Sequence, residues 1–104
     1  MAVTYVAQSN ASEITRMTTG QFTTTDASTA TITLGYTPRL VILLEETAPG
    51  HYIWAENMTA SKIIKTVAAG TVTLDTTQLV TATDNGFTFV PINASDTYTW
   101  VAYG

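Results

Sequence analysis

The chain contains no cysteine and only one histidine, His51. The lack of cysteine excludes disulfide bonds, thiolate metal sites and cysteine nucleophiles. A single histidine excludes a metal site with two histidine ligands, and any Ser-His-Asp arrangement would depend on His51 alone. His51 follows Pro49-Gly50, where we expect a turn and a solvated side chain. The stability of the fold is therefore expected to come from packing.

Basic residues are scarce, with four Lys and Arg against eight Asp and Glu and a net charge of -4. Phosphate binding requires clustered basic side chains, so we expect no nucleic-acid partner. The sequence has no run of roughly 20 apolar residues, and Met1 to Asn10 lacks the basic start and apolar middle of a signal peptide. We therefore expect no membrane partner.

Motifs for catalysis and nucleotide binding are also missing from the sequence. None of the patterns G-x-G-x-x-G, G-x-x-x-x-G-K-[ST] or G-x-S-x-G occurs. The aspartates stand singly in expected turns, without the spacing of a calcium loop, and Glu45 and Glu46 are expected to end a strand and keep its edge soluble. The sequence predicts a protein that is not an enzyme, with no catalytic residue, no cofactor and no metal.

Threonine makes up about 22% of the residues and, together with Val, Ile and Tyr, favours β-strands. Apolar and polar residues alternate in segments 30–34, 70–74, 87–89 and 97–102, as in strands with one solvated face. Gly, Pro, Asn and Asp clusters separate these segments at spacings of roughly 8 to 14 residues, which suits antiparallel sheets. The prediction is an all-β protein, a small antiparallel β-sandwich or barrel, in which residues 1–104 form a single domain.

Residues 40–44 are five consecutive apolar residues, so both faces of this strand need cover. We expect Leu40, Ile42 and Leu44 to enter the core. Val41 and Leu43 would then be covered by the N-terminal segment of the chain or by a neighbouring subunit. The complete predicted core consists of Ile32, Leu34, Leu40, Ile42, Leu44, Ile53, Val72, Leu74, Phe87, Phe89, Tyr98 and Trp100.

Two segments are harder to interpret. Residues 18–31 carry few large apolar side chains apart from Phe22, so we expect an exposed hairpin or arm. Residues 60–69 place apolar side chains at helical spacing, which leaves a short helix as an alternative. We favour a strand here, because Ile63, Ile64 and Val67 are β-branched and lose side-chain freedom in helices.

Six segments of strand and turn residues follow one another in a characteristic order: Gly20–Thr23, Thr31–Arg39, Trp54–Met58, Ile64–Leu74, Gly86–Thr88 and Tyr98–Ala102. This order resembles that of small virion-associated structural proteins of tailed bacteriophages. The resemblance spans roughly residues 20 to 102 and includes no catalytic signature.

The resemblance implies a capsid decoration or cement protein on the capsid surface of the virion, assembled in the host cytoplasm, with the major capsid protein as its partner. A tail-fibre or tail-tip module that binds a host receptor or glycan is the alternative. We also expect self-association, as a trimer, because cement proteins often sit where three capsomers meet. The residues expected to contact the shell or a neighbouring subunit are Phe22, Thr23, Thr24, Thr25, Val41, Leu43 and Trp100.

Overall fold

The chain folds into strands and turns. The computed structural model describes residues 16–25, 28–47, 49–58, 62–67, 70–91 and 95–104, and within these ranges there is no helix, so none that could span a membrane. The strands are β1 (Met17–Thr23), β2 (Ala30–Thr33), β3 (Leu40–Glu45), β4 (Gly50–Ala55), β5 (Ile63–Thr66), β6 (Val72–Asp75), β7 (Val80–Thr83), β8 (Gly86–Phe89) and β9 (Thr97–Tyr103).

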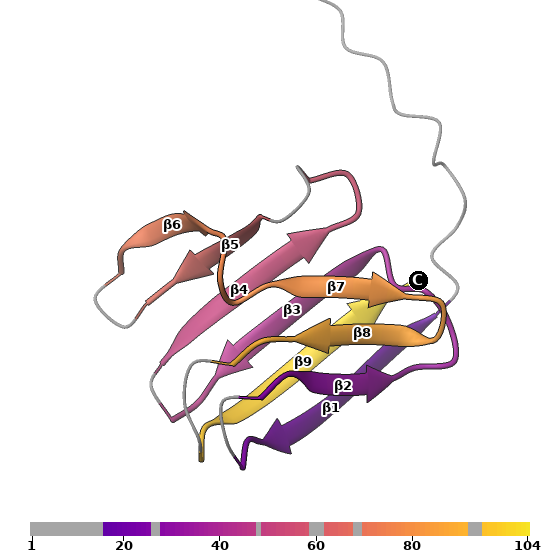
Figure 1. The fold of residues 1–104 in the computed structure, drawn as a ribbon, viewed down its shortest axis with the longest axis horizontal. Coiled ribbons are helices and arrows are strands. Elements are labelled where there is room, and N and C mark those ends of the chain that lie inside the picture. The colour runs from indigo at the N-terminus through magenta and orange to yellow at the C-terminus, as the bar shows by residue number, and fades with distance from the viewer. Residues whose placement is uncertain (1–15, 26–27, 48, 59–61, 68–69, 92–94) are drawn as a thin grey trace, which may run out of the picture.

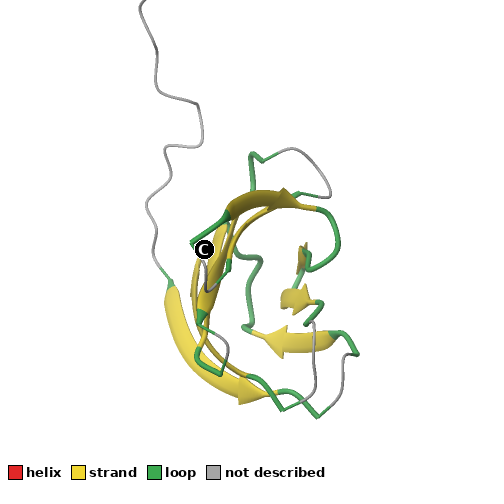
Figure 2. Ribbon diagram, turned by 90° about the vertical axis from the view of Figure 1, so that its left-hand side faces the viewer, coloured by secondary structure: helices red, strands yellow, loops and turns green. Residues whose placement is uncertain are grey.

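The strands form two antiparallel sheets that pack face to face (Figure 1). The larger sheet has the order β1-β9-β3-β4-β5-β6, and the smaller has the order β2-β8-β7. In Figure 2 the six-stranded sheet curves around the three-stranded sheet, which lies on its inner side. This arrangement confirms the prediction of a small all-β fold.

Aromatic rings join the two sheets. The ring centroids of Phe89 on β8 and Tyr98 on β9 are 5.1 Å apart, and those of Phe87 and Trp100 are 5.6 Å apart, both in edge-to-face geometry. The predicted core positions Phe87, Phe89, Tyr98 and Trp100 are thus confirmed. The complete buried cluster consists of Val41, Leu43, Tyr52, Ile63, Val80, Phe87, Phe89, Tyr98, Trp100 and Ala102, with Ile32 and Leu34 packed against it.

The middle residue of β1 is Gly20, so at this point the backbone of the strand contacts the core directly. Gly20 lies opposite Trp100 in the β1–β9 pairing. A Cβ atom at position 20 would lie 2.5 Å from Cζ2 of Trp100, which is closer than carbon atoms can pack. The indole ring of Trp100 therefore lies directly over the backbone of β1, and glycine is required at this position.

The expected orientation of β3 is wrong. Val41 and Leu43 are fully buried in the chain's own core, whereas Leu44 is 45% exposed. Five consecutive apolar residues give both faces of the strand the same character, so the sequence does not show which face is buried. The pairing with the neighbouring strands determines it. Leu43 lies opposite Tyr52 on β4 and Trp100 on β9, whose large side chains face the smaller sheet.

Other predicted core residues share this reversal. Ile53 pairs with Ile42 and also faces away from the smaller sheet, as Leu40 does. Val72 and Leu74, on the edge strand β6, are 63% and 58% exposed. Leu40, Ile42, Leu44, Ile53, Val72 and Leu74 therefore lie on the outward face of the six-stranded sheet.

The expected arm and turn are also replaced by strands. Over its seven residues β1 pairs with β9, and β2 pairs with β8 in the other sheet, so residues 18–31 form neither a hairpin nor a free arm. His51, expected on a turn, lies within β4. The preference for a strand over a helix is confirmed for Ile63–Thr66, which form β5, whereas residues 60, 61, 68 and 69 lie outside the described residues.

Two neighbouring leucines on β3 test this orientation. Leu43→Ala should lower the free energy of unfolding by about 2–5 kcal/mol, because it leaves a cavity between the sheets. The same substitution at Leu44, which is partly exposed, should cost less than about 1 kcal/mol. Urea unfolding of both variants measures the difference. Equal losses would show that β3 does not present Leu43 to the core.

Candidate binding groove

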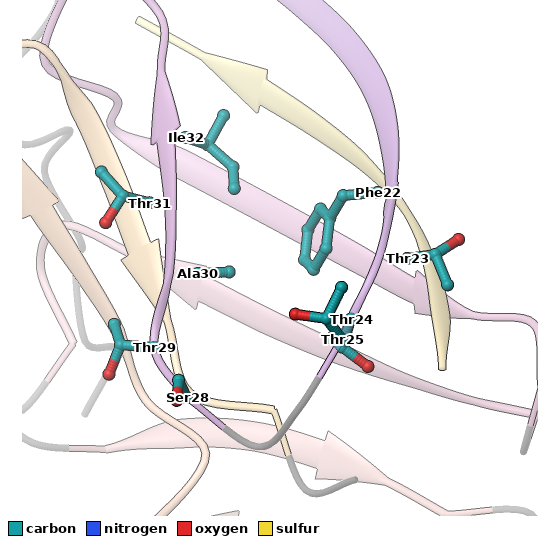
Figure 3. A pocket seen from close by; sticks show the side chains of 9 residues that line it. All are labelled: Phe22, Thr23, Thr24, Thr25, Ser28, Thr29, Ala30, Thr31 and Ile32. Atoms are coloured by element: carbon teal, nitrogen blue, oxygen red, sulfur yellow. The ribbon is translucent and has the colours of Figure 1, made fainter. Parts of the chain in front are cut away.

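A groove of about 440 Å³ lies between β1 and β2, where the two sheets are open to each other (Figure 3). Figure 3 shows Phe22, Ala30 and Ile32 pointing into the space between the two strands, while Thr23 and Thr31 point away. Its lining consists of Phe22, Thr23, Thr24, Thr25, Ser28, Thr29, Ala30, Thr31 and Ile32. Among the described residues, the lining therefore consists of an apolar floor and a rim of hydroxyl groups, with no charged side chain.

Each of the two strands beside the groove is the edge strand of its sheet. Among the described strands, β1 ends the six-stranded sheet and has β9 as its one partner, and β2 ends the three-stranded sheet and has β8 as its one partner. An edge strand presents backbone N–H and C=O groups that can pair with a strand from another chain. The groove thus combines apolar contact with two free strand edges.

The residues expected to make contacts separate into two groups. Phe22, Thr23, Thr24 and Thr25 all line the groove, although the Phe22 ring also stacks on Tyr98 at 5.3 Å. The other three expected contacts, Val41, Leu43 and Trp100, are at most 7% exposed and belong to the core. The expectation of external contacts through these three residues is therefore wrong, because no part of Val41 or Leu43 is accessible to another chain.

A pair of buried carboxyl groups lies at the ends of two central strands. Glu45 ends β3 and is 7% exposed, and Asp96 precedes β9 and is 6% exposed. The Tyr52 hydroxyl donates a hydrogen bond of 3.2 Å to Oε1 of Glu45. Burial, together with the hydrogen bond and negative charge of Asp96, raises the pKa of Glu45 to about 7.

The carboxyl pair is therefore expected to hold a proton below neutral pH. Burial, and then the nearby Tyr98 and Glu45, raise the pKa of Tyr52 far above its usual value, so its hydroxyl remains a neutral donor. Oδ2 of Asp96 is buried without a hydrogen-bond donor among the residues that the structure describes. A proton on Glu45 reduces the cost of burying the two carboxyl groups side by side.

Thr24, which follows β1, is hydrogen-bonded to Asp96, one of the two carboxyl residues. Its backbone N–H donates to the carbonyl oxygen of Asp96 at 2.9 Å, and its Oγ1 accepts from the backbone N–H of Asp96 at 3.0 Å. The carbonyl oxygen of Thr24 accepts from the N–H of Ser95 at 2.7 Å. One wall of the groove is thus tied directly to the backbone of the carboxyl pair.

The position of the pair favours a role in stability over a role in chemistry. Neither carboxyl group lines the groove or a second pocket of about 410 Å³, which is bordered by Trp54 and Val80. Within the described part of the chain, no group of three or more His, Cys, Asp and Glu side chains could hold a metal ion. Sequence reasoning missed the pair because it placed Glu45 at a solvated strand edge and Asp96 in a turn. The available signal was that Glu45 shares a strand face with Val41 and Leu43.

Comparison with known proteins identified no relative of this chain. The chain matches no protein-family model, no curated protein and no solved structure. The groove and the carboxyl pair are therefore interpreted from their own geometry and chemistry.

The raised pKa of Glu45 predicts that the fold loses stability as the pH rises. The folded state binds a proton more tightly than the unfolded state, so the stabilisation is complete below about pH 4.5 and is lost as the pH rises to about 7. The melting temperature should therefore fall between about pH 5 and about pH 8. The pKa of Asp75 is lowered by hydrogen bonds from Gln78 and Thr77, so Asp75 stays ionised throughout this range.

Glu45→Gln provides the control, because an amide can donate to Asp96 and accept from Tyr52 without titrating. Its melting temperature should vary less between these two pH values than that of the unsubstituted protein. A pH dependence unchanged by Glu45→Gln would rule out this carboxyl pair as its source.

Proposed function

We propose that this chain is a non-enzymatic structural protein of a tailed-phage particle, which decorates and stabilises the capsid shell by binding the major capsid protein. The proposal joins the sequence resemblance of residues 20–102 to the groove between β1 and β2. The groove is the observation that carries it, because its shape and chemistry suit a segment of polypeptide. The major capsid protein would supply that segment.

Two features of the groove support a protein ligand. Its two flanking strands are both edge strands, so an extended segment could form backbone hydrogen bonds with either of them. Phe22, Ala30 and Ile32 offer apolar contacts for alternate side chains of such a segment. The described lining residues carry no charge, which favours a segment without charged residues, since a charge buried against them would lack a partner.

Repetition makes modest contacts sufficient for this role. The groove is small compared with a standard protein interface, so each copy needs to contribute only a few kcal/mol. Many copies bound at equivalent positions of a closed shell would add these contributions and make the shell harder to disrupt.

Ala30 and Ala82 provide a matched pair of variants for testing the groove. Both lie on edge strands of the smaller sheet, Ala30 opposite Phe89 and Ala82 opposite Phe87, and both are half-buried. Ala30→Lys places a long charged side chain in the groove and should weaken binding to capsids at least about tenfold, or about 1.4 kcal/mol. Ala82→Lys, at the second pocket, should bind as the unsubstituted protein does.

The measurement is cosedimentation of purified protein with capsids that lack it, together with the temperature at which these capsids disrupt. Circular dichroism of both variants checks that the sheets are intact. Equal binding by the two variants would remove the groove from the proposal. Failure of the unsubstituted protein to bind capsids, together with binding to host cells, would favour the tail-fibre or tail-tip function.

A further inference from the structure

The outward face of the six-stranded sheet carries a row of apolar side chains that crosses five adjacent strands. The pairings align Val101 with Ile42, Ile42 with Ile53, Ile53 with Ile64, and Ile64 with Leu74. These positions face away from the smaller sheet, because they alternate with residues that face it. On either side of the row lie further apolar positions, namely Leu40 and Tyr103, and Leu44 and Val72.

Charged side chains are few on this face: the carboxylate of Glu46 lies at its β1–β9 side, where it accepts hydrogen bonds from the outward-facing Gln21 at 2.6 Å and Thr99 at 2.9 Å. Over the described strands of this sheet, no outward position is Lys, Arg, Asp or Glu, and His51 is the one imidazole. Five large apolar side chains are exposed among the described residues, and four of them lie on this face: Met17 at 62%, Leu44 at 45%, Val72 at 63% and Leu74 at 58%. An exposed apolar area of this extent marks an interaction surface.

The smaller sheet shows how the same chain builds a solvated face. Apart from Gly86, its outward strand positions are threonines, with Thr88 on β8 paired to Thr31 on β2 and to Thr81 on β7. Threonine keeps the β-branched shape that suits a strand and adds a hydroxyl group that binds water. The contrast between the two outward faces indicates that the six-stranded sheet is covered by protein and the smaller sheet by water.

We propose that the outward face of the six-stranded sheet is the interface between copies of this chain. The self-association expected from the sequence assigned Val41 and Leu43 to this contact, but both are buried inside the chain. The apolar residues of β3 that can contact another copy are therefore Leu40, Ile42 and Leu44, on the outward face. This assignment concerns how copies meet, and it does not depend on capsid binding.

Charge and area both favour a second copy as the occupant. Each copy carries a net charge of -4, so two copies repel each other least where carboxylates are few, and no described position of the apolar row from Val101 to Leu74 is charged. Six strands about 4.8 Å apart and roughly 20 Å long give a face of roughly 550 Å² in projection. The accessible area of such a side-chain surface exceeds its projection, which brings it close to the roughly 800 Å² that each partner buries in a stable interface.

Sedimentation equilibrium at micromolar concentration tests the proposal with charged variants. Leu74→Lys adds a charge at one end of the apolar row, at a position exposed enough for the monomer to accept lysine. Thr81→Lys adds the same charge to an exposed position of the smaller sheet and is the control. We expect the unsubstituted chain and Thr81→Lys to form dimers or trimers of the 11.1 kDa chain, and Leu74→Lys to dissociate at least about tenfold more readily.

Amide chemical shifts recorded over a dilution series give a second measurement on the unsubstituted chain. The shifts that change with concentration should belong to β3, β4, β5 and β9 residues of the six-stranded sheet. A monomeric unsubstituted chain, or an oligomer unaffected by Leu74→Lys whose concentration-dependent shifts lie elsewhere, would overturn the proposal. A monomer that still binds capsids would overturn this interface and leave the proposed function intact.

Discussion

Strand β9 is paired along both of its edges, and the rest of the sandwich depends on this pairing. It pairs with β1 over seven residues and with β3 over six. Its inward side chains, Tyr98, Trp100 and Ala102, are all buried, and the two aromatic rings contact Phe89 and Phe87 of the smaller sheet. One strand therefore supplies backbone partners to the larger sheet and apolar contacts to the smaller one. The edge strand β1 pairs with no other strand in the part of the chain that the structure describes, so its position follows from that of β9.

The polar contacts at one end of β9 connect the core to the groove. Asp96, immediately before this strand, is joined by its backbone to Thr24, and its side chain faces Glu45. A buried carboxyl pair is less favourable than apolar packing unless it is protonated or well bonded. Because Asp96 contacts both Glu45 and Thr24, a change in the protonation of Glu45 and a displacement of β1 would both affect Asp96. The carboxyl pair and the wall of the groove are thus connected through Thr24.

The sequence was most informative where apolar and polar residues alternate. The alternation in residues 87–89 and 97–102 was sufficient to predict the strands and their buried aromatic residues. It failed for residues 40–44, because a continuous apolar run has the same pattern on both faces. The edge strand β1 was missed because it is rich in threonine and contacts the core mainly through Phe22 and its backbone at Gly20. The carboxyl pair joins Glu45 to Asp96, which are far apart in the chain. The groove is lined by residues within 22–32, but it forms because β1 and β2 pair in different sheets.

The contact between Gly20 and Trp100 also limits how this protein can change over time. An edge strand usually accepts many side chains, since half of its environment is solvent. Here even the single methyl group of alanine would collide with the indole ring, so an ordinary drift from glycine to alanine or serine would lift β1 from β9. Phe22, two residues further along the same strand, would lose its stacking on Tyr98 in that event. Position 20 should therefore remain glycine in any descendant that keeps this groove, whereas an exposed rim threonine such as Thr25 meets no comparable restriction.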